Sequence, residues 1–199
     1  QGVMGTYYAI EVGFEENIAN ACKEHYAPLG PSDEVPNSPT SIVVALADKI
    51  DTLTSFWAIN EKPTGSKDPF ALRRSALGLI RIIIENDIRI SLSDILALGN
   101  DGADIEDLKY FIHQRMKVFL RDQSLRHDLI DACLSLDKGD DLALLVKKSF
   151  ALMDFIETSD GSNLIQGFKR ANNILLQAEQ NDGVEYSYGA DPKYAEEEA

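Results

Sequence analysis

Features that would point to a secreted or membrane protein are scarce in this sequence. Only two of its 199 residues are cysteines, Cys22 and Cys133. They form neither a CxxC pair nor a zinc-ligand spacing, which favours two free thiols in a reducing compartment. No apolar run approaches the ~18 residues that a membrane-spanning helix needs, and there is no signal peptide. We therefore expect a cytoplasmic protein without a membrane partner.

Basic residues are also few. The chain has 19 Lys and Arg against 33 Asp and Glu, which gives a net charge of -14. Nucleic-acid binding depends on basic groups that neutralise phosphates, so this balance argues against a protein that binds nucleic acid over its whole surface. We expect no DNA partner. A local basic patch remains compatible with the same balance, so the distribution of the cations matters more than their sum.

Strand signals are almost absent, because alternating β-branched runs bounded by turn residues hardly occur. Helical periodicity dominates instead, and the predicted fold class is all-α, a helical array. Helices are expected over residues 15–26, 39–57, 70–85, 92–98, 105–122, 128–136, 142–157 and 164–177. Ser38 and Asp68, each followed by proline, are predicted to cap two of them. Apolar residues surround the last two turns of 70–85, which predicts the most buried helix.

The chain lacks an initiator methionine and begins with QGVMGTYYA, so we expect a fragment of a longer protein. Asn100-Asp101-Gly102 is the strongest candidate for a boundary. It divides the chain into a first domain over 1–100, a helical segment over 101–179 and an acidic tail over 180–199. The composition of the tail predicts a solvated segment, unless its tyrosines anchor it; these are Tyr186, Tyr188 and Tyr194.

The cations that are present gather in two windows. Residues 62–89 hold six Lys or Arg against three acids, and residues 109–127 hold five against one. Arginine suits bidentate contact with phosphate or carboxylate, so the windows indicate contact with an RNA backbone or a partner protein. Solvated faces and internal salt bridges are the alternative. The candidate contact residues are Lys67, Arg73, Arg74, Arg81, Arg115, Lys117 and Arg121.

Catalytic patterns are missing. No nucleophile elbow, complete phosphate-binding loop or metal-ligand set occurs, so we expect no catalytic residue and no metal site. Asp48, within ALADKID, resembles the last ligand segment of HD-type phosphohydrolases, which also need a His and an earlier His-Asp pair to activate water. The sequence has one His-Asp pair, His127-Asp128, and it follows Asp48. We interpret Asp48 and His25 as an HD-like remnant, with Asp48 as a buried helix residue in a salt bridge or cap; a metal-dependent phosphohydrolase stays an alternative.

One long motif resembles a known family. PTGSKDPFALRR at residues 63–74 is similar to the beta subunit of the bacterial two-subunit glycyl-tRNA synthetase. Other matches follow in the family's order and span nearly the whole chain: QGVMGTYYA at 1–9, HYAP at 25–28, ALADKIDTL at 45–53 and KRANNIL at 169–175. Asn60 departs from the family, which usually has glycine there, and this affects a turn.

The resemblance implies a fragment that contains the second half of a degenerate HD-like domain and the helical segment before an anticodon-binding domain. In that aminoacyl-tRNA synthetase the alpha chain activates glycine with ATP and Mg²⁺, while the beta chain binds tRNA(Gly) and supports the alpha chain. The fragment alone is therefore expected to hold no cofactor and to have no ligase activity. Arg73 and Arg74 are the residues of the long motif left for contact with tRNA or the alpha chain. A purely structural helical spacer is the remaining alternative.

Overall fold

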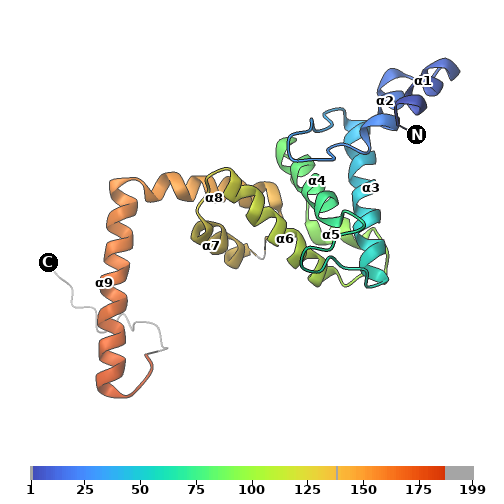
Figure 1. Ribbon diagram of the computed structural model, residues 1–199. Coiled ribbons are helices and arrows are strands. Elements are labelled where there is room, and N and C mark those ends of the chain that lie inside the picture. The colour runs from blue at the N-terminus through green and yellow to red at the C-terminus, as the bar shows by residue number, and fades with distance from the viewer. Residues whose placement is uncertain (1, 138, 187–199) are drawn as a thin grey trace. The chain divides into compact units, whose positions relative to one another are not determined.

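The computed structural model describes residues 2–137 and 139–186, and its regular elements there are all helices (Figure 1). This confirms the all-α prediction. The helices are α1 Gly2–Val12, α2 Glu16–Glu24, α3 Pro39–Ala58, α4 Leu72–Glu85, α5 Leu92–Ala97, α6 Ile105–Asp122, α7 His127–Asp137, α8 Leu142–Ile156 and α9 Ser159–Asp182. In the described part of the chain, no helix is both long enough and apolar enough to cross a bilayer.

Two compact units share the chain, Gln1–Met153 and Asp154–Ala199. In the first unit, α6 packs against α3, α4 and α5. Residues 100–102 lie inside this first unit, and the division of the chain at this point stays a prediction. Asn100 and Gly102 form a short turn, in which the Gly102 N–H donates to Asn100 Oδ1 at 2.9 Å.

Helix α4 lies at the centre of the first unit. Eight of its 14 residues are buried, as the apolar pattern of its last turns predicts. Leu79, Ile80 and Ile83 pack in one core with Leu53 and Trp57 of α3 and with apolar side chains of α6. The side chains of this core hold α3 and α4 side by side.

The start of α4 differs from the predicted helix start at residue 70. Asp68 does cap the helix, but from four residues before Leu72: its Oδ1 accepts the Leu72 N–H at 2.8 Å and its Oδ2 accepts the Arg73 N–H at 3.0 Å. Ala71 occupies the N-cap position itself with a left-handed φ of 56°. At α3, Ser38 holds the predicted N-cap position but makes no side-chain capping bond.

Helix α1 was not predicted from the sequence. Its segment contains two glycines together with β-branched and aromatic residues, which have low helix propensity. The helix packs against α2, where a Cβ added at Gly5 would lie 3.2 Å from Cys22 Cβ. Several large apolar side chains of α1 remain exposed, among them Tyr7, Tyr8 and Val12.

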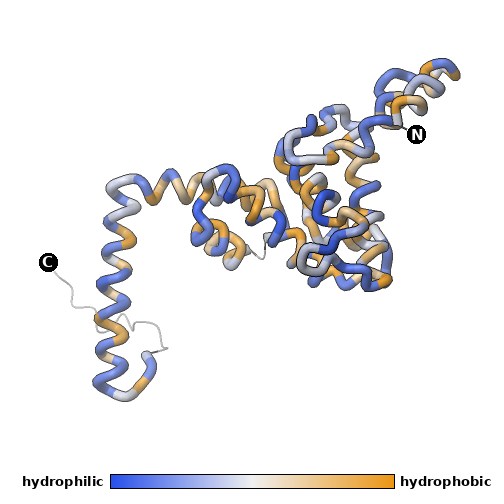
Figure 2. Tube along the Cα trace, viewed as in Figure 1, coloured by the Kyte–Doolittle hydropathy of each residue, from blue (hydrophilic) through white to orange (hydrophobic). Residues whose placement is uncertain are grey.

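In the second unit, α9 is longer at its start than predicted. The cluster of polar residues and glycine at 158–162 resembles a loop, but it caps the helix, because Thr158 Oγ1 accepts the Gly161 N–H at 3.1 Å. Figure 2 shows hydrophobic and hydrophilic residues alternating along α9. Tyr186, one of the predicted anchors, donates from its hydroxyl to Asp182 at 2.6 Å; Tyr188 and Tyr194 lie outside the described residues.

Candidate functional site

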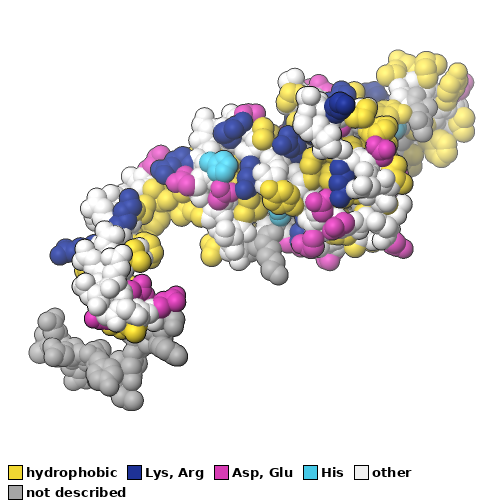
Figure 3. Space-filling view, turned by 60° about the horizontal axis from the view of Figure 1, so that its bottom comes forward, with side chains coloured by type: hydrophobic (Ala, Val, Ile, Leu, Met, Phe, Trp, Pro, Cys, Tyr) yellow, Lys and Arg dark blue, Asp and Glu magenta, His cyan; other side chains and the backbone are white. Residues whose placement is uncertain are grey.

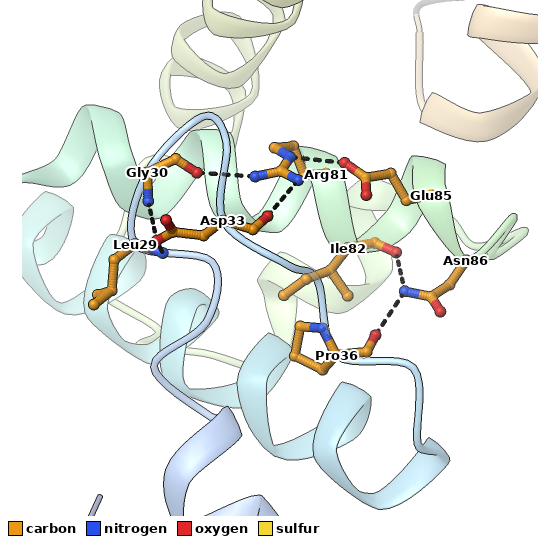
Figure 4. A network of polar contacts seen from close by, with 8 residues as sticks. All are labelled: Leu29, Gly30, Asp33, Pro36, Arg81, Ile82, Glu85 and Asn86. Carbon is orange, nitrogen blue, oxygen red and sulfur yellow. Dashed lines mark hydrogen bonds and ion pairs between the residues drawn. The ribbon is translucent and has the colours of Figure 1, made fainter.

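The segment between α2 and α3, residues 25–37, is fastened to α4 by hydrogen bonds (Figure 4). Arg81 donates to the carbonyl oxygens of Gly30 at 2.9 Å and Asp33 at 2.7 Å, and to Glu85 Oε1 at 2.7 Å. One turn further on, Asn86 donates to the Pro36 carbonyl at 3.0 Å. These hydrogen bonds hold the loop against α4.

Arg81 was predicted as a contact residue for RNA or a partner. Its side chain is only 8% exposed, and its donors face carbonyls and a carboxylate of the same chain. Arg74 and Arg81 do share one face of α4, as their spacing predicts, but toward its end that face is covered by the loop. The structure thus gives Arg81 an internal role in holding the loop.

Lys49 of α3 is the other cation buried in this region, at 4% exposed. Its side chain crosses α4 at Gly78, where an added Cβ would lie 2.5 Å from Lys49 Cε. Its ammonium donates to the carbonyls of His25 and Tyr26 at 3.4 and 3.3 Å, beyond the end of α2. Burial lowers the pKa of Lys49, and the nearby charge of Asp48 opposes that shift. The sequence analysis missed this residue, although a lysine on the core-facing side of an amphipathic helix was a signal.

The turn before α4 presents the long motif. Thr64 and Lys67 exchange two backbone hydrogen bonds, of 3.1 and 2.8 Å. Arg73 closes the turn, because its guanidinium donates to the Gly65 carbonyl at 2.7 Å and to the Lys67 carbonyl at 3.5 Å. The side chains of Lys67 and Arg74 are exposed and make no hydrogen bond or ion pair with any residue that the structure describes. The predicted contact residues of this motif therefore divide into one that shapes the turn and two that face solvent.

Acids neutralise most other cations of the first window. Lys62 pairs with Asp107 at 2.8 Å, and Arg89 pairs with Asp141 at 2.6 Å. The hydrogen bonds from Lys62 and from the indole of Trp57 lower the pKa of Asp107 below its usual value. On the face that Figure 3 shows, Lys and Arg side chains of the first unit form separate groups with Asp and Glu between them.

Acids also pair with most cations of the second window, residues 109–127. Lys117 pairs with Asp131 at 2.5 Å, and Arg126 pairs with Asp128 at 2.6 Å. Arg115 is half-buried over the ring of Phe111, at 5.9 Å, and its Nε has no hydrogen-bond partner. Arg121 is exposed and has no side-chain partner among the described residues. Of the predicted contact residues, Lys67, Arg74 and Arg121 thus combine exposure with an unneutralised charge.

The two residues interpreted as an HD-like remnant line the same cavity. His25 and Asp48 line one open cavity of about 650 Å³ between α2 and α3, together with Cys22 and Asp51. His25 Nδ1 donates to the Ala21 carbonyl at 3.1 Å. The interpretation of Asp48 as a buried helix residue in a salt bridge or cap is wrong, because its side chain is exposed and makes no ion pair or hydrogen bond in the described chain. Among the residues that the structure describes, no group of three His, Cys, Asp or Glu side chains is arranged to hold a metal ion.

Comparison with known proteins gives consistent matches. The family model described as glycyl-tRNA synthetase beta subunit matches residues 1–135. The glycine–tRNA ligase beta subunit of Ruegeria sp. (strain TM1040) is 62% identical over 199 residues, which cover 100% of this chain and 29% of that protein. The protein of the same name from Paracoccus denitrificans (strain Pd 1222) is 61% identical over 98% of this chain and 29% of its own length. The chain therefore spans less than a third of the length of these relatives.

Proposed function

Because this chain belongs to the glycyl-tRNA synthetase beta subunit family, we propose that it forms a non-catalytic part of a glycine–tRNA ligase. In this proposal, its exposed cations contact the backbone of tRNA(Gly), and its helices support the alpha subunit. The alpha subunit holds ATP and Mg²⁺ and activates glycine. The protein acts in the cytoplasm, and its two cysteines, which are free thiols in the described chain, suit a reducing compartment.

The observation that carries the tRNA contact is the exposure of Lys67 and Arg74 without an acidic partner. In a chain with a net charge of -14, the field around a paired cation is largely cancelled, whereas an unpaired cation can still attract a phosphate. Phosphate contacts of this kind position a protein on a nucleic acid without reading its sequence. Arg73 supports the same surface, because its bonds to the turn hold Lys67 in place.

The test uses the holoenzyme with the full-length beta subunit. A triple variant, Lys67→Gln, Arg74→Gln and Arg121→Gln, removes the three predicted contact residues that are exposed and form no ion pair in the described chain. The matched control, Arg89→Gln, Arg126→Gln and Lys147→Gln, removes the same charge from three cations that form ion pairs; exposed pairs contribute only about 0–1 kcal/mol to stability. Two activities are compared, ATP–pyrophosphate exchange with glycine and aminoacylation of tRNA(Gly).

We expect the triple variant to raise the KM for tRNA(Gly) several-fold relative to the control, with glycine activation unchanged. Equal KM values in the variant and the control would contradict the tRNA contact and leave the structural spacer. A loss of glycine activation in the triple variant would assign this surface to the alpha subunit instead.

A further inference from the structure

A second, smaller cavity lies beside the exposed turn, between the 25–37 loop, α3 and the first turn of α4. It has a volume of about 240 Å³, and its lining includes Tyr26, Lys49, Arg74, Ser75 and Asp48. We propose that this cavity binds one phosphate group of the RNA backbone, an inference that rests on the proposed tRNA contact. It assigns Lys49 and Ser75, which no sequence pattern singled out, to the same contact as Arg74.

Lys49 supplies a positive charge that forms no ion pair in the described chain. Its ammonium has three N–H donors, and its two hydrogen bonds, to the carbonyls of His25 and Tyr26, are long. It makes no third hydrogen bond and no ion pair with a carboxylate in the described chain. Keeping an ammonium 4% exposed with neutral partners is costly, and an anion in the adjoining cavity would lower that cost.

Arg74 and Ser75 supply the donors at the rim. The Arg74 guanidinium is exposed and has no side-chain partner in the described chain, and neither has the Ser75 hydroxyl. A guanidinium binds phosphate through two parallel hydrogen bonds. The first N–H groups of α4 do not contribute, because Asp68 accepts those of Leu72 and Arg73. The site is therefore built from side chains of two helices.

The charge and size of the cavity favour an RNA phosphate over other occupants. Asp48 opposes an anion, but Lys49 and Arg74 together outweigh its single charge, so the lining carries a net positive charge. Cavities that enclose a small molecule usually measure about 300–1,000 Å³. At about 240 Å³, this one suits a phosphate group whose nucleoside remains outside, as in a polymer, better than a complete nucleotide.

The experiment measures equilibrium binding of tRNA(Gly) to the holoenzyme over a series of KCl concentrations. Arg74→Gln is expected to reduce the slope of log K against log salt by about 0.7–0.9, the value for one lost phosphate contact. Arg74→Lys should keep the wild-type slope because it keeps the charge. Ser75→Ala should weaken binding without changing the slope. Lys147→Gln, which removes an exposed cation that pairs with Asp87 and does not line the cavity, is the matched control and should match the wild type.

The outcomes separate this inference from the proposed function. If the wild type shows a steep slope and Arg74→Gln matches Lys147→Gln, the cavity does not bind an RNA phosphate, although tRNA contacts exist elsewhere. If the wild-type slope is itself near zero, the proposed tRNA contact fails as well. A raised KM for ATP in the exchange reaction of Arg74→Gln, with an unchanged tRNA slope, would assign the cavity to a free nucleotide and overturn the inference.

Discussion

Replacement of Arg81 by methionine tests whether this arginine serves the fold. Arg81 makes two charged hydrogen bonds to carbonyl oxygens of the 25–37 loop, at 2.9 and 2.7 Å. A hydrogen bond to a charged group contributes about 1.5–3 kcal/mol, so the loss of both removes about 3–6 kcal/mol. Its bond to Glu85, which is 41% exposed, adds about 0.3–0.5 kcal/mol.

Methionine retains most of the apolar stem, which recovers part of the loss. We therefore expect Arg81→Met to lower the free energy of unfolding by about 3–5 kcal/mol, measured by urea denaturation. Hydrogen exchange should accelerate in residues 29–36, because the carbonyls that held the loop lose their donors. The matched control is Arg74→Met, which removes an exposed arginine from the same helix face and should change stability by about 0.5 kcal/mol or less. A decrease in the free energy of unfolding below about 1 kcal/mol for Arg81→Met would refute the internal role of Arg81. It would favour the prediction that Arg81 contacts RNA or a partner.

Three further changes probe separate parts of the structure. Gly78→Ala places a Cβ 2.5 Å from Lys49 Cε, and should lower the free energy of unfolding by about 1–3 kcal/mol in urea denaturation. Burial lowers the pKa of His113 below its ordinary 6.5. The contribution of neutral His113 to the free energy of unfolding is therefore present above pH 6.5 and declines as the pH falls toward the folded-state pKa. His113→Gln should flatten the loss of stability between about pH 7.5 and about pH 5.5, measured by urea denaturation. Gly161→Ala places a Cβ in steric conflict with the Phe155 carbonyl oxygen, and circular dichroism should show a loss of helix; an unchanged spectrum would contradict that packing.

Most helices could be predicted because their residues follow one rule along the chain. The apolar stripes of α3, α4 and α6 repeat at helical spacing, and their bounds agree with the predictions to within a few residues. Helix α1 breaks that rule, since its apolar and small residues are not arranged on one face. Its helical state depends on packing against α2, which no local pattern reveals.

The roles of the cations could not be predicted from their positions in the sequence. Arg74 and Arg81 occupy equivalent positions on α4, yet one faces solvent and the other lies under the 25–37 loop. The difference comes from where that loop crosses the helix, which is a long-range property. Lys117 was likewise predicted as a contact residue, but its ion pair with Asp131 of α7 depends on how α6 and α7 meet. Burial and pairing therefore decide which cations remain available, and both are tertiary features.

The most direct test of this account is the salt dependence of tRNA(Gly) binding to the holoenzyme with the triple Lys67, Arg74 and Arg121 variant. Each lost phosphate contact reduces the slope of log K against log salt by about 0.7–0.9. The account predicts a slope lower by about 2–3 in this variant and an unchanged slope in the control variant of Arg89, Arg126 and Lys147, whose side chains form ion pairs. Equal slopes in both variants and the wild type would contradict the claim that these unpaired cations contact tRNA.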